Sequence, residues 1–133
     1  MNDTTQQRAP QQSPPPGVVT CMKMCVAFGW SAVECHEAYA WDAPREHYHM
    51  TLRGPLVTTG EVTHDGSPRR HGVTITWIHD GFRWHRGEVI SQCSATDAWL
   101  RRHVRANHRQ RCDVGFRDIR ALMAAYPVNQ PTR

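Results

Sequence analysis

The sequence predicts a small α+β domain, and three of its patterns support this fold class. Apolar residues recur at helical spacing near both ends of the chain, whereas apolar and polar residues alternate at strand spacing between residues 47 and 91. Inside that middle region, an Asp-Gly pair separates two alternating runs, as in a β-hairpin. With 133 residues, of which 39% are hydrophobic, the chain is expected to form one core and one domain.

The single domain is expected to span residues 18–128. Residues 1–17 are rich in Gln and Pro, and they bury too little apolar surface to offset the entropy that ordering costs. The sequence therefore predicts a disordered tail before the domain. Residues 129–133 follow the last apolar stretch and are expected to fray.

A helical pair is predicted in the first part of the domain, over Val18–Trp41. Thr20 can cap the first helix, and Gly29 ends it. Ser31 and Glu34 then form a capping-box pattern, in which each side chain satisfies a free N–H group of the first helical turn. The sequence therefore predicts a second helix from this box to the end of the range.

An antiparallel sheet centred on a Trp-Trp hairpin is predicted for the middle of the domain. Asp80-Gly81 lies between two alternating runs and matches a two-residue type I′ turn, in which both residues need positive φ. This turn would place Trp77 opposite Trp84, and Ile75 opposite Arg86. The strand order between residues 47 and 72 stays open.

Two helices are predicted near the C-terminus. The first begins at Ser94 or Thr96, and its inward stripe consists of Trp99, Leu100, His103, Val104 and Asn107. The last helix has apolar residues at spacings of three, four and three, namely Phe116, Ile119, Met123 and Tyr126. Pro127 stops it.

Positive charge is concentrated in the last quarter of the chain. Residues 99–133 contain eight Arg and two acids, a net charge of +6, whereas residues 1–98 contain eight Lys or Arg and ten acids, a net charge of −2. A clustered positive field attracts polyanions, and Arg matches the geometry of phosphate. The sequence thus predicts a non-enzymatic regulatory or accessory protein that binds nucleic acid or a nucleoprotein through Arg101, Arg102, Arg105, Arg109, Arg111, Arg117 and Arg120.

A protein-binding inhibitor or adaptor, of the kind that mobile genetic elements encode, is the alternative function. Exposed Trp, Tyr and Arg side chains would then be the anchors, because these residue types dominate the energetics of protein interfaces. The choice between DNA, RNA and protein, and the oligomeric state, stay open.

Zinc is the metal that the sequence could bind. Cys21, Cys25, Cys35 and His36 offer sulfur and nitrogen donors, and the first two lie at i, i+4 on one helical face. The two-residue spacing of a zinc knuckle is absent, and the odd number of five Cys favours free, buried thiols. No cofactor is therefore expected, with zinc as the alternative.

His49 defines a second alternative function. The string from His49 to Leu52, H-x-T-L, resembles one half of the signature of the two-histidine phosphoesterases. That resemblance implies a histidine acting as acid or base on a phosphodiester, paired with a second H-x-T or H-x-S string. The candidate second copy, His71 to Thr74, has one more residue between its His and Thr.

The chain lacks the features of a membrane or secreted protein. No stretch is apolar and long enough to cross a bilayer, and the N-terminus has no apolar segment of the secretory type. We therefore expect a cytoplasmic protein without a membrane partner.

Overall fold

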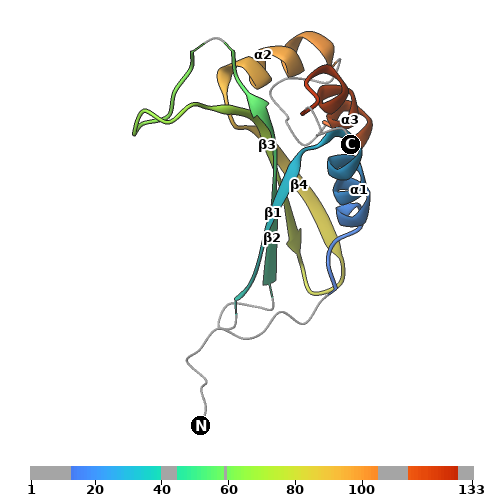
Figure 1. Ribbon diagram of the computed structural model, residues 1–133. Coiled ribbons are helices and arrows are strands. Elements are labelled where there is room, and N and C mark those ends of the chain that lie inside the picture. Colours follow the sequence, from blue (N-terminus) through green and yellow to red (C-terminus); the bar gives the residue numbers. More distant parts are fainter. Residues whose placement is uncertain (1–12, 40–44, 59, 105–113, 129–133) are drawn as a thin grey trace.

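The computed structural model describes residues 13–39, 45–58, 60–104 and 114–128, and these form an α+β fold (Figure 1). Within them, one helix precedes a four-stranded sheet and two helices follow it. The elements are α1 (Val18–Phe28), β1 (Ser31–Tyr39), β2 (Arg45–Leu56), β3 (Arg70–His79), β4 (Trp84–Ser91), α2 (Ser94–His103) and α3 (Phe116–Ala125). Most of the predicted tail, residues 1–12, and the predicted frayed end, residues 129–133, lie outside the described residues.

The four strands form an antiparallel meander in the order β1-β2-β3-β4. Each strand therefore pairs with its neighbour in the sequence, which gives the strand order that the sequence left open. Side chains of β2 alternate between buried and partly exposed, and those of β3 do the same. This period of two is the pattern of a sheet that packs on one face only.

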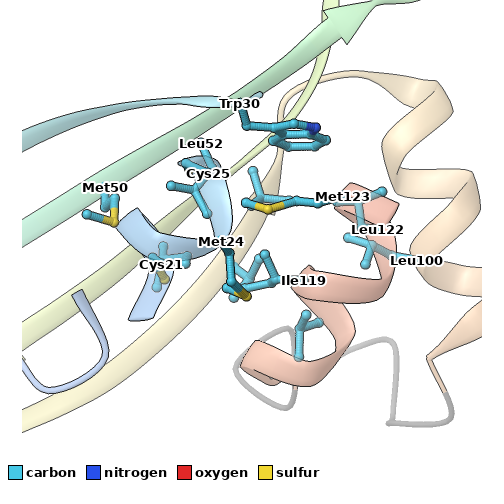
Figure 2. Packing of buried hydrophobic residues seen from close by; sticks show 14 of the residues in the cluster. Cys21, Met24, Cys25, Trp30, Met50, Leu52, Leu100, Ile119, Leu122 and Met123 are labelled. Atoms are coloured by element: carbon cyan, nitrogen blue, oxygen red, sulfur yellow. The ribbon is translucent and has the colours of Figure 1, made fainter. Parts of the chain in front are cut away.

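Helices cover one face of the sheet, and no described helix lies on the other (Figure 1). The core fills the space between that face and the helices (Figure 2). Its fully buried side chains come from α1, β2, β3, β4 and α3, and include Cys21, Met50, Leu52, Val73, Ile75, Val89, Ile119, Leu122 and Met123. Burying such side chains is the main favourable term that holds the helices on the sheet.

The predicted second helix of the N-terminal pair is wrong, because Ser31–Tyr39 form strand β1. Residues 40 and 41, the end of that predicted helix, lie outside the described residues. β1 pairs with β2 along its whole length, from Ser31 opposite Arg53 to Tyr39 opposite Arg45. The hydrogen bonds between these two strands take the place of the local bonds by which a capping box would have satisfied main-chain N–H groups. Glu34 accepts a hydrogen bond from the Tyr48 hydroxyl of β2 instead of capping a helix.

The predicted pairing within the β3–β4 hairpin is also wrong. Trp77 lies opposite Arg86, and Trp84 lies opposite His79, so the two Trp residues are not a cross-strand pair. The register shifts between Ile75 and Trp77 of β3, so Ile75 lies opposite Val89 instead of Arg86. The extra residue on β4 has the character of a β-bulge.

The loop of this hairpin explains the shift in pairing. Residues 80–83 separate the two strands, so the connection has four residues instead of two. The Asp80 carboxylate accepts hydrogen bonds from the N–H groups of Phe82 and Arg83, at 2.8 and 3.0 Å. The Arg83 amide, the His85 ring and the Phe82 amide together lower the pKa of Asp80. Phe82 therefore belongs to the loop, where its side chain is 92% exposed.

The two predicted C-terminal helices are present. α2 is capped by Cys93, whose sulfur accepts the N–H of Thr96 at 3.4 Å, so the cap lies one residue before the predicted Ser94. Trp99, Leu100 and Val104 are buried, as the inward stripe predicts, whereas His103 is exposed and Asn107 lies outside the described residues. In α3, Ile119 and Met123 are buried on the predicted stripe.

Gly54 of β2 is a close-contact position that tests this packing. A Cβ atom at Gly54 would lie 2.4 Å from Cε2 of Trp30, whose indole N–H donates to the Tyr126 carbonyl at 2.8 Å. We expect Gly54→Ala to lower the free energy of unfolding by about 1–3 kcal/mol, because the buried indole must shift. Urea titration measures this, with Val26→Ala on the exposed side of α1 as a control that should change stability by less than about 0.5 kcal/mol. Equal stability of the two variants would contradict the packing described.

Candidate functional site

Four of the seven predicted Arg side chains lie on two neighbouring helices. Arg101 and Arg102 lie at the end of α2, and Arg117 and Arg120 lie on α3, which contacts α2. All four are exposed. The other three predicted residues, Arg105, Arg109 and Arg111, lie outside the described residues.

The four described Arg side chains differ in their partners. Arg101 forms an ion pair with Asp97, with 2.6 Å between its Nε and the Asp97 Oδ2. Arg102, Arg117 and Arg120 form no ion pair with any residue that the structure describes. The guanidinium groups of these three are therefore not neutralised by a described acid, whereas that of Arg101 is.

The two acids of these helices both have hydrogen-bond partners other than Arg102, Arg117 and Arg120. Asp97 accepts a hydrogen bond from Ser91 in addition to its ion pair with Arg101. Asp118 accepts the N–H of Gly115 at 2.9 Å and so caps α3. Since α2 and α3 carry four Arg and two Asp, their described surface has a net charge of +2.

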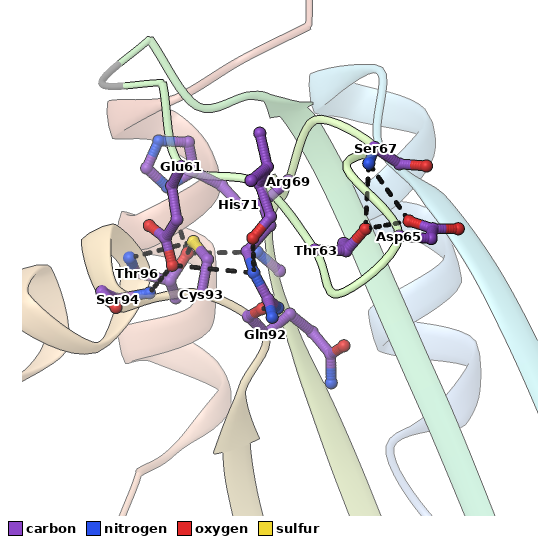
Figure 3. Close-up of polar contacts among 12 residues, drawn as sticks. Glu61, Thr63, Asp65, Ser67, Arg69, His71, Gln92, Cys93, Ser94 and Thr96 are labelled. Atoms are coloured by element: carbon purple, nitrogen blue, oxygen red, sulfur yellow. Dashed lines mark hydrogen bonds and ion pairs between the residues drawn. The ribbon is translucent and has the colours of Figure 1, made fainter.

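Buried polar contacts fix α2 to the sheet (Figure 3). Thr96 is fully buried, and its hydroxyl lies 3.1 Å from His71 Nδ1 and 3.1 Å from the Gly72 amide nitrogen, both on β3. At the start of the helix, the Ser94 N–H donates to Glu61 at 2.8 Å. A carboxylate at a helix N-terminus satisfies a free N–H group and is attracted by the positive end of the helix dipole. The position of the α2 Arg side chains is therefore set by β3 and by the loop before it.

A hollow of about 540 Å³ lies beside α2, between that helix, β4 and the loop before β3. Its charged lining consists of two acid–base pairs: Glu61 with Arg69, at 3.8 Å, and Asp97 with Arg101, at 2.6 Å. The charges in this hollow balance. A phosphate group there would have to displace a carboxylate, so we place the candidate phosphate contacts on Arg102, Arg117 and Arg120.

A second group of polar side chains, which the sequence did not predict as a group, joins β1 to β2. His36 and Glu46 lie 2.7 Å apart, and the Tyr48 hydroxyl donates to Glu34. Burial, followed by this hydrogen bond and the Glu34 charge, raises the pKa of Tyr48. These side chains come from alternate positions of two paired strands. The sequence analysis did not group them because it assigned Glu34 and His36 to a helix.

The four candidate zinc ligands do not converge. Cys21 and Cys25 are buried in α1, and burial raises the pKa of their thiols to about 12 and about 11, which disfavours the thiolate that binds zinc. Cys35 and His36 are successive residues of β1 and therefore point to opposite faces of the sheet. Across the described ranges, no three His, Cys, Asp or Glu side chains are grouped to hold a metal ion.

His49 lies on the face of the sheet that no described helix covers. It shares that face with Thr51, and its ring centroid is 6.1 Å from that of His47. In the candidate second copy, His71 is buried against α2, whereas Thr74 reaches the opposite face and lies 2.9 Å from the Thr51 hydroxyl. Among the described residues, His49 therefore lacks the second H-x-T string that the phosphoesterase resemblance implies.

Comparisons of this chain with protein-family models, with curated proteins and with solved structures find no match. The helices that the structure describes include none of sufficient length and apolar character to span a membrane.

The buried His71 makes the stability of the fold depend on pH. Burial lowers the pKa of His71 from 6.5, so the unfolded chain binds more protons below that pH and stability falls as the pH drops toward the folded pKa. Burial also lowers the pKa of His47, so this residue likewise makes the free energy of unfolding fall as the pH drops. We expect His71→Gln to weaken the loss of unfolding free energy between pH 7.5 and pH 5.5, measured by urea titration. His64→Gln in an exposed loop is the control, and an unchanged pH profile in His71→Gln would contradict this account.

Proposed function

We propose that the protein is a small, non-enzymatic regulatory or accessory protein that binds nucleic acid or a nucleoprotein through the Arg surface of α2 and α3. One observation carries this proposal. Arg102, Arg117 and Arg120 are exposed without an ion-pair partner in the described part of the chain, while the two acids of the same helices are engaged elsewhere. The result is an unbalanced positive surface on two helices in contact.

Guanidinium groups suit such a surface because they present a rigid set of donors that matches phosphate. Each phosphate that they neutralise releases condensed counterions, so affinity falls as salt rises. Three phosphate contacts to duplex DNA correspond to a slope of about −2.7 in a plot of log affinity against log salt. Backbone contacts of this kind position a protein on nucleic acid without reading its sequence.

The proposal predicts that charge position, and not net charge alone, sets the affinity. In the variant Arg102→Glu, Arg117→Glu, Arg120→Glu, affinity for a 20-base-pair duplex should fall at least about tenfold, and the salt slope should approach zero. The matched control reverses three exposed Arg side chains of the sheet and its hairpin, Arg45→Glu, Arg53→Glu and Arg83→Glu. Fluorescence anisotropy between 50 and 200 mM salt, with DNA and with RNA, measures both. The proposal fails if the two variants lose the same amount of affinity, or if neither variant loses affinity.

Protein binding is the second candidate, for an inhibitor or adaptor of the kind that mobile genetic elements encode. The outer side of α1 favours it, because Val19, Met22 and Val26 are 63%, 39% and 79% exposed there. These residues lie at successive turns of one helix and so form one stripe. A contiguous apolar stripe on a small domain is typical of a protein interface.

A pull-down from nuclease-treated lysate separates the two candidates. A protein partner that uses α1 should be retained by the parent chain after nuclease treatment and lost by the variant Val19→Ser, Val26→Ser. The triple Arg variant should still retain that partner, since its changes lie on other helices. Capture that disappears with nuclease, in parent and Ser variant alike, would contradict the protein-binding candidate.

A further inference from the structure

The segment that precedes α1 lies against the hairpin end of the sheet (Figure 1). The indole N–H of Trp84 in β4 donates to the carbonyl of Ser13 at 2.9 Å. Pro15 is buried, and Gly17 lies so close to the Phe116 ring that a Cβ atom there would come within 2.3 Å of it. The segment Ser13–Gly17 is thus held by an aromatic side chain at each end.

The sequence of this segment favours an extended backbone as far as Pro15, and Pro16 and Gly17 then form a turn into α1. Ser13, Pro14 and Pro15 each precede a proline, and the helical region is disfavoured for a residue in that position, which favours an extended conformation. Each proline ring also fixes φ near −65°, the value of a polyproline II helix. Such a helix has no internal hydrogen bonds, so its carbonyl groups can accept from outside donors. In this segment the Pro15 carbonyl accepts the Val18 N–H of the turn at 3.4 Å, which leaves the Ser13 carbonyl for an outside donor. The Trp84 indole is such a donor.

Beside the segment lies a hollow with three aromatic walls, Trp77, Trp84 and Phe116, which we call the aromatic groove. The Trp84 ring is held by three others: its centroid lies 5.0 Å from His79, 5.6 Å from His36 and 6.2 Å from Tyr48. Its contacts with His79 and Tyr48 are edge-to-face, an arrangement that aromatic pairs favour. The direction of the Trp84 N–H is therefore fixed by the sheet.

The segment does not fill this aromatic groove. A hollow of about 380 Å³ remains beside Pro16, lined by Trp77, Trp84, Arg86, Val114, Gly115 and Phe116. This volume lies within the range of protein sites that bind small ligands or side chains. The groove thus combines a fixed indole donor, aromatic walls and room beside a proline that it already holds.

We propose that this aromatic groove is a recognition site for extended, Pro-rich segments of a partner protein, and that Ser13–Pro16 of the same chain occupies it as a competing internal ligand. An indole donor beside aromatic walls is the chemistry by which Pro-rich segments are bound, because the proline rings pack on the aromatic rings while a carbonyl accepts the N–H. The stiffness of such a segment keeps the entropy cost of binding low. This site is separate from the Arg surface and from the outer stripe of α1, so it stands or falls independently of both.

A labelled peptide with the sequence of residues 8–17, RAPQQSPPPG, tests the proposal in the full chain by fluorescence anisotropy. The parent should bind it weakly, because its own segment competes. The variant Pro14→Gly, Pro15→Gly, Pro16→Gly should bind it about tenfold more tightly, and adding Trp84→Phe, which keeps a ring but removes the N–H, should reverse about five- to tenfold of that gain. A control peptide with Ala in place of every Pro should not bind.

A second measurement covers the case in which the Gly variant fails to fold. Titration of the parent chain with millimolar peptide should shift the indole N–H resonance of Trp84, identified by its absence in Trp84→Phe. No binding to the folded Gly variant, or no shift of that resonance in the parent, would overturn the proposal. A concentration-dependent dimer that the Gly changes abolish, with no peptide binding, would also overturn it, since the groove would then serve exchange of this segment between copies.

Discussion

The pairing register of β2 with β3 is the constraint on which the rest of the structure depends. Met50 lies opposite Ile75 and Leu52 opposite Val73, and all four side chains face the helices and are fully buried. Because strand side chains alternate with a period of two, a slip of one residue would move this set to the uncovered face. The burial of apolar surface under α1 and α3 therefore selects this register over its neighbours.

Each surface of functional interest follows from that register. On the helix side, the same alternation places Tyr48 opposite Trp77 within the core, where Tyr48 contacts both Trp77 and Trp84. Trp77 and Trp84 also line the aromatic groove. Thr96 of α2 is buried against His71, on the helix side of β3, which fixes that helix. In α3 the buried stripe leaves the opposite side of the helix, with its two Arg side chains, facing outward. The burial of the core residues thus determines which side chains are exposed to a partner.

Sequence patterns predicted the elements whose signals are local, and they failed where distant contacts decide. The spacing of Ile119 and Met123 gave α3 because a helix shows its period within a few residues. Ser31 and Glu34 gave a false helix because strand β1 is stabilised by pairing with β2, and its first partner is Arg53. The hairpin was found, but its register was wrong because the Asp80 carboxylate lengthens the loop. The aromatic groove was missed since its members are dispersed along the chain.

The register itself is open to one direct measurement, the cross-strand backbone NOEs of the full chain. This account predicts contacts between Met50 and Ile75 and between Leu52 and Val73, together with contacts from Ser31 to Arg53. Backbone contacts displaced by one residue along β2, or the i, i+3 contacts of a helix over residues 31–39, would contradict it. Either result would mean that the core, the aromatic groove and the contacts of α2 with the sheet are not formed by the residues described.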